Sequence, residues 1–167
     1  MGKKSVKENK NIYQTSREEI ELTREKASDL MQCISADRIE KIENEKSLPH
    51  PDEILVMADC YRKPNLPNYY CANECPIGKK YVPEVQMKEL SQIVLEILST
   101  LNSVEKQKNR LIEITVDGKI TKDELNDFTT IQDTLNQVSL TIDSLQLWIQ
   151  DSIMKGEISK DALSKTK

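Results

Sequence analysis

Three cysteines and the single histidine could together bind a metal ion. Cys71 and Cys75 are four residues apart, and Cys60 and His50 precede them. Thiolate and imidazole are ligands that zinc prefers, and the spacing is within the usual range. However, we expect Cys60 to face the core of its own helix, and free cysteines in proteins are often simply buried. We therefore expect no metal site, and zinc bound by these four residues is the alternative.

A twelve-residue segment, 113–124, partly matches a calcium-binding loop. Its matching residues, at positions 3, 5, 6, 8, 9 and 12 of such a loop, are Thr115, Asp117, Gly118, Ile120, Thr121 and Glu124. The first position holds Glu113, where Asp is the strong expectation. Residues 118–125 also recur in altered form as residues 156–163, where the ligand types are lost. The shared features are a glycine that ends a helix and a Thr or Ser that caps the next one, so helix capping is the preferred interpretation.

The sequence contains no pattern that indicates catalysis. It has no nucleophile–base pair, no glycine-rich phosphate-binding loop and no zinc-protease motif. His50 is the only histidine and lies between two prolines, which is typical of a loop residue. We therefore expect no enzymatic activity and no cofactor.

Composition favours a soluble, all-α protein. Of 167 residues, 37% are hydrophobic and 31% charged, and only four are glycine, which argues against the many tight turns of an all-β fold. No run of about 18 apolar residues predicts a membrane span. The N-terminus lacks the apolar stretch of a secretory signal, and four cysteines without such a signal predict reduced thiols in the cytoplasm.

Charge is distributed unevenly along the chain. Residues 1–80 contain 14 basic and 14 acidic side chains, whereas residues 81–167 carry the whole net charge of −4. Residues 1–10 are predicted to be a disordered basic arm that contacts phosphates, with four lysines against one glutamate: Lys3, Lys4, Lys7 and Lys10. If one half of the chain binds an anionic polymer, it is the first half, although its overall neutrality is weak support.

Residues 11–64 are predicted to form four short helices. Two overlapping capping boxes at Thr15 and Ser16 predict the first helix start, and Thr23 is expected to cap a second helix that ends near residue 31, with Ala27 and Leu30 facing inward. Ser35 is expected to cap a third helix, residues 36–43, and the fourth covers residues 52–61. Residues 65–84 are expected to be an irregular connector rich in Pro, Cys and Tyr.

Residues 85–155 are predicted to form a long antiparallel helical hairpin, followed by a tail, residues 156–167. The first predicted seam consists of Leu90, Val94, Ile97, Leu101, Val104 and Leu111. The second consists of Phe128, Ile131, Leu135, Val138, Ile142, Leu145 and Ile149, in a helix expected to begin near Thr121. Further apolar residues indicate that the hairpin has another surface to cover, by self-association or by packing on the first half.

The region around the third helix has the pattern of a helix-turn-helix unit. Ile34, Ile39 and Ile42 provide a buried turn residue and two core residues of the second helix. The exposed positions of this helix would be Ala36, Asp37, Arg38, Lys41 and Asn44.

This region resembles the XRE (phage-repressor-like) helix-turn-helix family of transcriptional regulators. The matching segments are residues 22–27, 34–35, 39–44 and 48–49. The resemblance covers residues 11–64 and implies a sequence-specific reader of double-stranded DNA that is usually a homodimer. Two features depart from the family pattern. Ala27 and Ile34 are seven residues apart where five is usual, and Asp37 and Glu40 lie where DNA would bind.

Our first hypothesis is a DNA-binding transcriptional regulator. Arg38, Lys41 and Asn44 would contact bases or phosphates, Ser35 would cap the recognition helix, and the hairpin would mediate dimerisation or receive a signal. The alternative is a helical protein-interaction module whose helix-turn-helix no longer binds DNA, with a partner held by the hairpin. A calcium or zinc sensor is a third hypothesis.

Overall fold

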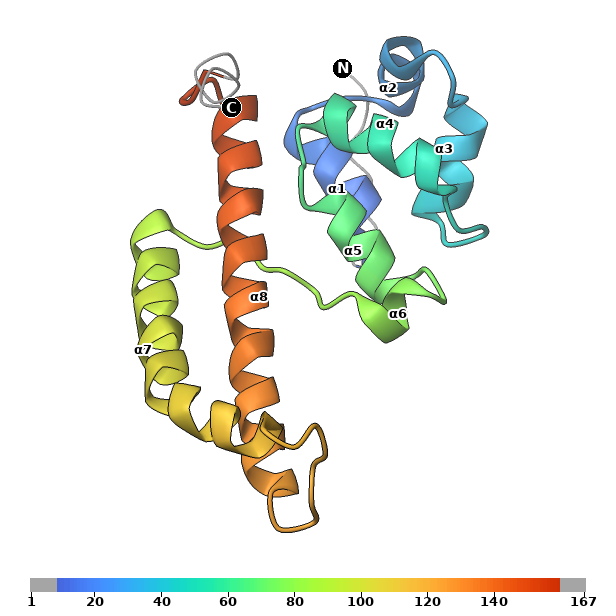
Figure 1. Cartoon of the computed structure of the whole chain (residues 1–167). Coiled ribbons are helices and arrows are strands. Elements are labelled where there is room, and N and C mark those ends of the chain that lie inside the picture. The colour runs from blue at the N-terminus through green and yellow to red at the C-terminus, as the bar shows by residue number, and fades with distance from the viewer. Residues whose placement is uncertain (1–8, 160–167) are drawn as a thin grey trace. The chain divides into compact units, whose positions relative to one another are not determined.

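The computed structural model describes residues 9–159, and all of its regular elements are helices (Figure 1). In chain order they are α1 Ile12–Glu19, α2 Arg24–Met31, α3 Ala36–Glu43, α4 Pro51–Tyr61, α5 Leu66–Asn73, α6 Gly78–Tyr81, α7 Leu90–Thr115 and α8 Leu125–Met154. No strand occurs in this range, which confirms the predicted all-α class. None of these helices is both long enough and apolar enough to cross a bilayer.

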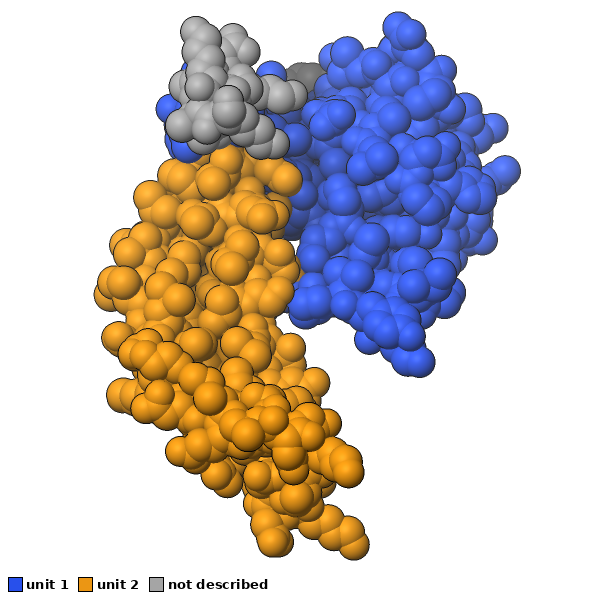
Figure 2. All heavy atoms as spheres, viewed as in Figure 1, with its two compact units in different colours: residues 1–84, 153–167 blue, residues 85–152 orange. Residues whose placement is uncertain are grey.

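The chain divides into two compact units (Figure 2). The first unit consists of residues 1–84 with 153–167, and the second consists of residues 85–152. The first contains α1 to α6, and the second contains α7 and most of α8.

Polar residues that precede α1, α2 and α3 set where these helices begin. The side chains of Asn11, Thr23 and Ser35 accept hydrogen bonds from backbone N–H groups of the first turn, at 3.0, 3.2 and 3.2 Å. These bonds satisfy donors that a helix start otherwise leaves free. The predicted caps at Thr23 and Ser35 are confirmed. The first helix starts earlier than predicted, because Asn11 caps it in place of Thr15 or Ser16.

One hydrophobic core holds the first unit together. Its buried members are Tyr13, Ala27, Met31, Ile34, Ile39, Ile42, Ile54, Met57, Ala58, Tyr61 and Leu66. The inward orientation predicted for Leu30 is wrong, since this side chain is 64% exposed. Ala27 and Met31, one helical turn apart, define the buried face of α2 instead.

Residues 65–84 are more ordered than the irregular connector that the sequence predicts. They contain α5 and α6, and Leu66 is fully buried in the core of the first unit. A Cβ atom at Gly78 would lie 2.0 Å from the carbonyl oxygen of Cys71, so α5 and α6 approach too closely for any other residue. Asn68 on α5 also donates a hydrogen bond to the carbonyl of Pro83, at 3.0 Å.

In the second unit, α7 and α8 form the predicted long helical pair (Figure 1). Gly118 adopts the left-handed conformation, with φ of 70°, in the turn between the two helices. The second helix starts at Leu125, later than predicted. One contact of the predicted capping box is nevertheless present, since the backbone N–H of Thr121 donates to the Glu124 carboxylate at 2.9 Å, and the Thr121 hydroxyl also donates to it at 2.7 Å. Arg110 of α7 donates to Asp127 of α8 at 2.7 Å, so these two residues lie beside each other across the pair.

The residues that face the inside of the hairpin differ in part from the predicted seams. On α7, Ile93 and Ile114 are buried, whereas the predicted seam residues Val94 and Leu101 are exposed. The buried and half-buried positions of this helix are Ile93, Glu96, Ile97, Thr100, Ser103, Val104, Gln107, Leu111 and Ile114. On α8, Ile131 and Thr141 are buried, and the predicted seam residues Leu135 and Ile142 are exposed.

Candidate nucleic-acid interface

A tight connection between α2 and α3 fixes the orientation of the candidate recognition helix. Gln32 ends α2 in the left-handed conformation, with φ of 59°, and three residues later Ser35 caps α3. Ile34 in the connection is buried, as are Ile39 and Ile42 on α3. Ile39 and Ile42 thus orient α3 toward the core, and Asp37, Glu40 and Lys41 on its other side are exposed.

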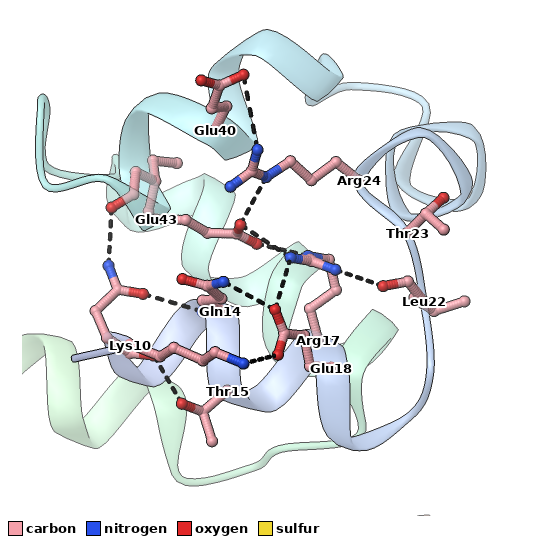
Figure 3. Close-up of polar contacts among 12 residues, drawn as sticks. Lys10, Gln14, Thr15, Arg17, Glu18, Leu22, Thr23, Arg24, Glu40 and Glu43 are labelled. Atoms are coloured by element: carbon pink, nitrogen blue, oxygen red, sulfur yellow. Dashed lines mark hydrogen bonds and ion pairs between the residues drawn. The ribbon is translucent and has the colours of Figure 1, made fainter. Parts of the chain in front are cut away.

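A buried network around Glu43 links the end of α3 to α1 and α2 (Figure 3). Arg17 of α1 donates two hydrogen bonds to the Glu43 carboxylate, at 2.5 and 2.9 Å, and Arg24 of α2 donates a third at 2.7 Å. Glu43 is only 1% exposed. Burial alone would lower the pKa of Arg17, but hydrogen bonds to Glu43 and attraction by its charge outweigh burial, so this pKa is raised.

Further contacts of α1 and α2 reinforce this network. Arg17 also donates to the carbonyl oxygen of Leu22, just before α2, and Arg24 lies 3.7 Å from the carboxylate of Glu40. The Asn11 amide donates to the carbonyl of Ile42 at 2.8 Å. The last turn of α3 is therefore held from two sides by charged and polar groups.

A second set of bonds joins α3 to α4 through Arg38. Its guanidinium makes a bidentate pair with Glu53, with both distances 2.7 Å, and donates to the Ser47 hydroxyl at 2.7 Å and the Leu48 carbonyl at 2.9 Å. Hydrogen bonds from Arg38 lower the pKa of Glu53 despite partial burial, and a bond from the His50 backbone N–H adds to this effect. The guanidinium predicted to contact DNA is thus committed to partners within the protein.

The other predicted contact residues lie together along α3. Ser35, Asp37 and Lys41 are exposed, and Ala36 and Asn44 are half-buried. The Asn44 amide makes only one long hydrogen bond, 3.5 Å to Glu40 on the preceding turn. This surface carries charges of both signs, because Asp37 and Glu40 accompany Lys41.

The predicted basic arm is described only at its end. Lys10 pairs with Glu18 of α1 at 2.6 Å. Lys3, Lys4 and Lys7 lie outside the described residues.

The residues considered as metal ligands are not gathered into a site. Within residues 9–159, no group of three or more His, Cys, Asp or Glu side chains could hold a metal ion. Cys60, Cys71 and Cys75 are half-buried free thiols, and burial raises the pKa of Cys60. The Cys75 sulfur accepts a hydrogen bond from the backbone N–H of Gly78 at 3.5 Å. In the segment resembling a calcium loop, Glu124 bonds to Thr121, as described above.

The sequence interpretation missed the charged residues that position α3, namely Arg17, Glu43 and Glu53. A signal for Glu43 was present, since it is four residues after Ile39 and adjacent to Ile42, and therefore on the apolar side of the helix. An acid on such a face requires a buried partner. Its partners come from two other helices, and no spacing within α3 identifies them. The chain matches no protein-family description, no curated protein and no solved structure.

Proposed function

We propose that this chain is a sequence-specific DNA-binding transcriptional regulator that inserts α3 into the major groove. The observation that carries the proposal is the bracing of α3. Its last turn is tied to α1 and α2 through Glu43, and its first turn to α4 through Arg38, while Asp37 and Lys41 remain exposed. A short helix that must present side chains to base edges needs such external support, since packing rather than propensity stabilises helices of this length.

The exposed residues of α3 have side chains suited to reading base pairs. Lys41 could donate to guanine and Asn44 could form two hydrogen bonds with adenine, while Asp37 could accept from the amino group of cytosine. The Ser35 hydroxyl and the exposed helix start suit a phosphate, and the methyl group of Ala36 suits the methyl group of thymine.

In this proposal Arg38 positions α3 and does not read a base. Its guanidinium already makes four hydrogen bonds to Glu53, Ser47 and Leu48. Lys3, Lys4 and Lys7 would contribute contacts to the phosphate backbone. The helical hairpin would mediate homodimerisation or receive a regulatory signal.

The charge of α3 favours a second candidate, a protein-interaction module that no longer binds DNA. Residues 35–46 contain three exposed acids, Asp37, Glu40 and Glu45, against two exposed lysines, Lys41 and Lys46. Acids facing DNA are repelled by its phosphates, so this surface would also suit a mixed-charge protein partner.

The two candidates are separated by selecting bound sequences from a random duplex library, at low and near-physiological salt. The regulator predicts an enriched motif that persists at the higher salt. Lys41→Ala should then weaken binding to that motif, whereas Lys79→Ala, which removes the same charge from an exposed position on α6, should not. If no motif is enriched, or if binding depends only on low salt, the DNA-reading proposal is refuted.

A further inference from the structure

The helical hairpin exposes a row of large apolar side chains that its two helices do not cover. We call this the outer stripe, and it consists of Val94, Leu98 and Leu101 on α7 with Leu135 and Ile142 on α8. Each of these residues is between 42% and 53% exposed. Leu95, beside the stripe on α7, is 68% exposed. Isolated exposed leucines are ordinary, but a continuous row of them indicates an interface.

The residues of the outer stripe lie on one side of the hairpin. Val94 and Leu101 each follow an inward-facing residue of α7, namely Ile93 and Thr100. Leu135 and Ile142 likewise follow inward-facing residues of α8. One step along a helix rotates the side chain by about 100° in a fixed sense. Because the two helices run in opposite directions, this step brings both sets of side chains to the same side of the pair.

The register of the hairpin makes the two sets neighbours. Arg110 donates a hydrogen bond to Asp127, so these two residues lie at the same level of the hairpin. Because the helices are antiparallel, each residue before Arg110 on α7 lies level with a residue the same number of positions after Asp127 on α8. Leu101 is then level with the residue after Leu135, and Val94 is level with the residue after Ile142. The stripe is therefore one apolar surface shared by both helices. Helices with two inward-facing heptad positions and a third apolar position beside them are typical of bundles with more than two helices.

Most of the polar residues that border the outer stripe are uncharged. They are Ser91, Asn102, Gln132, Ser139 and Gln146. The charged exceptions are Glu105, one turn after Leu101, and Asp143, which follows Ile142. In a two-fold symmetric contact the same surface meets itself, and a surface with few charges does so with little repulsion.

The exposed area fits the requirement of a dimer. The stripe and Leu95 together expose on the order of 500 Å² of apolar residue surface, which is at the upper end of what monomeric proteins leave open. A standard interface buries about 800 Å² per partner, of which about 60% is apolar. The patch is therefore of the size that one standard interface needs.

We propose that the outer stripe is the contact with a second copy of this chain, so that two hairpins assemble into a four-helix bundle. The dimer gives the proposed regulator two recognition helices, but the argument for the stripe uses no property of α3. The proposal is tested without DNA, so either proposal can fail while the other stands.

The test is sedimentation equilibrium of the full chain over a range of concentrations. We expect a monomer–dimer equilibrium for the wild type. Leu98→Glu and Ile142→Glu, one on each helix, should each raise the dimer Kd by about 30-fold or more, as expected for residues at the centre of an interface. Two controls are Ser99→Glu, on the opposite side of α7, and Leu30→Glu, an exposed leucine of the first unit. Both should leave the dimer Kd within a few-fold of the wild type.

Hydrogen exchange of the wild type at concentrations above and below the dimer Kd gives a readout that does not depend on variants folding. Protection that rises with concentration should be confined to residues 90–102 and 132–149. A wild type that remains monomeric overturns the proposal, whatever else covers the stripe. A dimer whose Kd is unchanged by both Leu98→Glu and Ile142→Glu, or whose concentration-dependent protection lies in residues 9–84, also overturns it.

Discussion

Replacing Glu43 by glutamine tests the assertion that the buried network holds α3 in place. The substitution keeps the shape of the side chain and removes its charge. Arg17, whose side chain is only 7% exposed, then keeps its positive charge without the compensating carboxylate. Arg24 loses the same partner.

The expected cost follows from this geometry. Removing one member of a buried ion pair typically costs about 3–5 kcal/mol, because the remaining charge is left uncompensated in the interior. A small domain is stable by only about 5–15 kcal/mol in total. For a unit of this size, each 1 kcal/mol corresponds to about 4–8 °C, so we expect Tm of the first unit to fall by at least about 12 °C.

The distribution of aromatic residues lets this unit be observed separately. All five tyrosines lie in residues 1–84, and the single tryptophan, Trp148, lies in α8. Near-ultraviolet circular dichroism and absorbance of tyrosine therefore report on the first unit, and tryptophan fluorescence reports on the hairpin. Urea unfolding followed by both signals should show the loss of stability of Glu43→Gln in the tyrosine signal.

Glu40→Gln is the matched control, since Glu40 is on the same helix and also pairs with Arg24, but its side chain is 48% exposed. An exposed pair contributes about 0–1 kcal/mol, so this change should have little effect. If Glu43→Gln costs no more than Glu40→Gln, the reasoning about the buried network is refuted.

Three further predictions concern other contacts of the first unit. Burial raises the pKa of Glu74 and outweighs the hydrogen bond from the Tyr13 hydroxyl, so the ionised carboxylate is disfavoured in the folded state. Glu74→Gln should therefore raise the free energy of unfolding relative to the wild type at pH 7. This advantage should be lost by about pH 4, where the carboxyl of the unfolded wild type is also largely protonated. An equal difference at both pH values would contradict this. Arg38→Ala and Glu53→Gln should each destabilise the unit by about 1–3 kcal/mol in urea unfolding, because each leaves a partly buried charged partner; if only the arginine change also weakens DNA binding, Arg38 reads DNA and does not merely position α3. Gly78→Ala should cost more than about 2 kcal/mol in the same assay, because its methyl group would overlap backbone; stability within 0.5 kcal/mol of the wild type would show that α5 and α6 are not held as closely as described.

Local signals in the sequence predicted α2, α3 and α4 of the first unit well. Thr23 and Ser35 cap helices where the sequence places them, because a cap depends only on residues within one turn. The buried positions of α3 were also predictable, since Ile39 and Ile42 lie on one face of any helix. The ion pairs of α3 were not predictable from the sequence, because Arg17 and Glu53 lie in other helices, whose packing angles depend on the whole core.

In the hairpin, the sequence predicted the helices but not which residues face each other. The row of Ile97, Val104 and Leu111 on α7 can be completed by either of its two flanks, one containing Val94 and Leu101 and the other Thr100 and Gln107. Hydrophobicity favours the flank with Val94 and Leu101. In the structure, Thr100 and Gln107 of α7 face inward and Leu101 faces outward. The rotation of α7 about its axis depends on how it packs against α8, and the periodicity of one helix alone does not determine it.

The sequence by itself therefore determined that this protein is helical, where α2, α3 and α4 begin and end, and which side of α3 is buried. These properties depend on backbone hydrogen bonds and side-chain periodicity within a few residues. Only the tertiary structure decided that Arg38 is bound to Glu53, that residues 66–81 belong to the folded first unit, and that the hairpin leaves a leucine-rich side open. The reason is that each of these outcomes depends on the distance between segments that are far apart in the chain, and local propensity does not encode such distances.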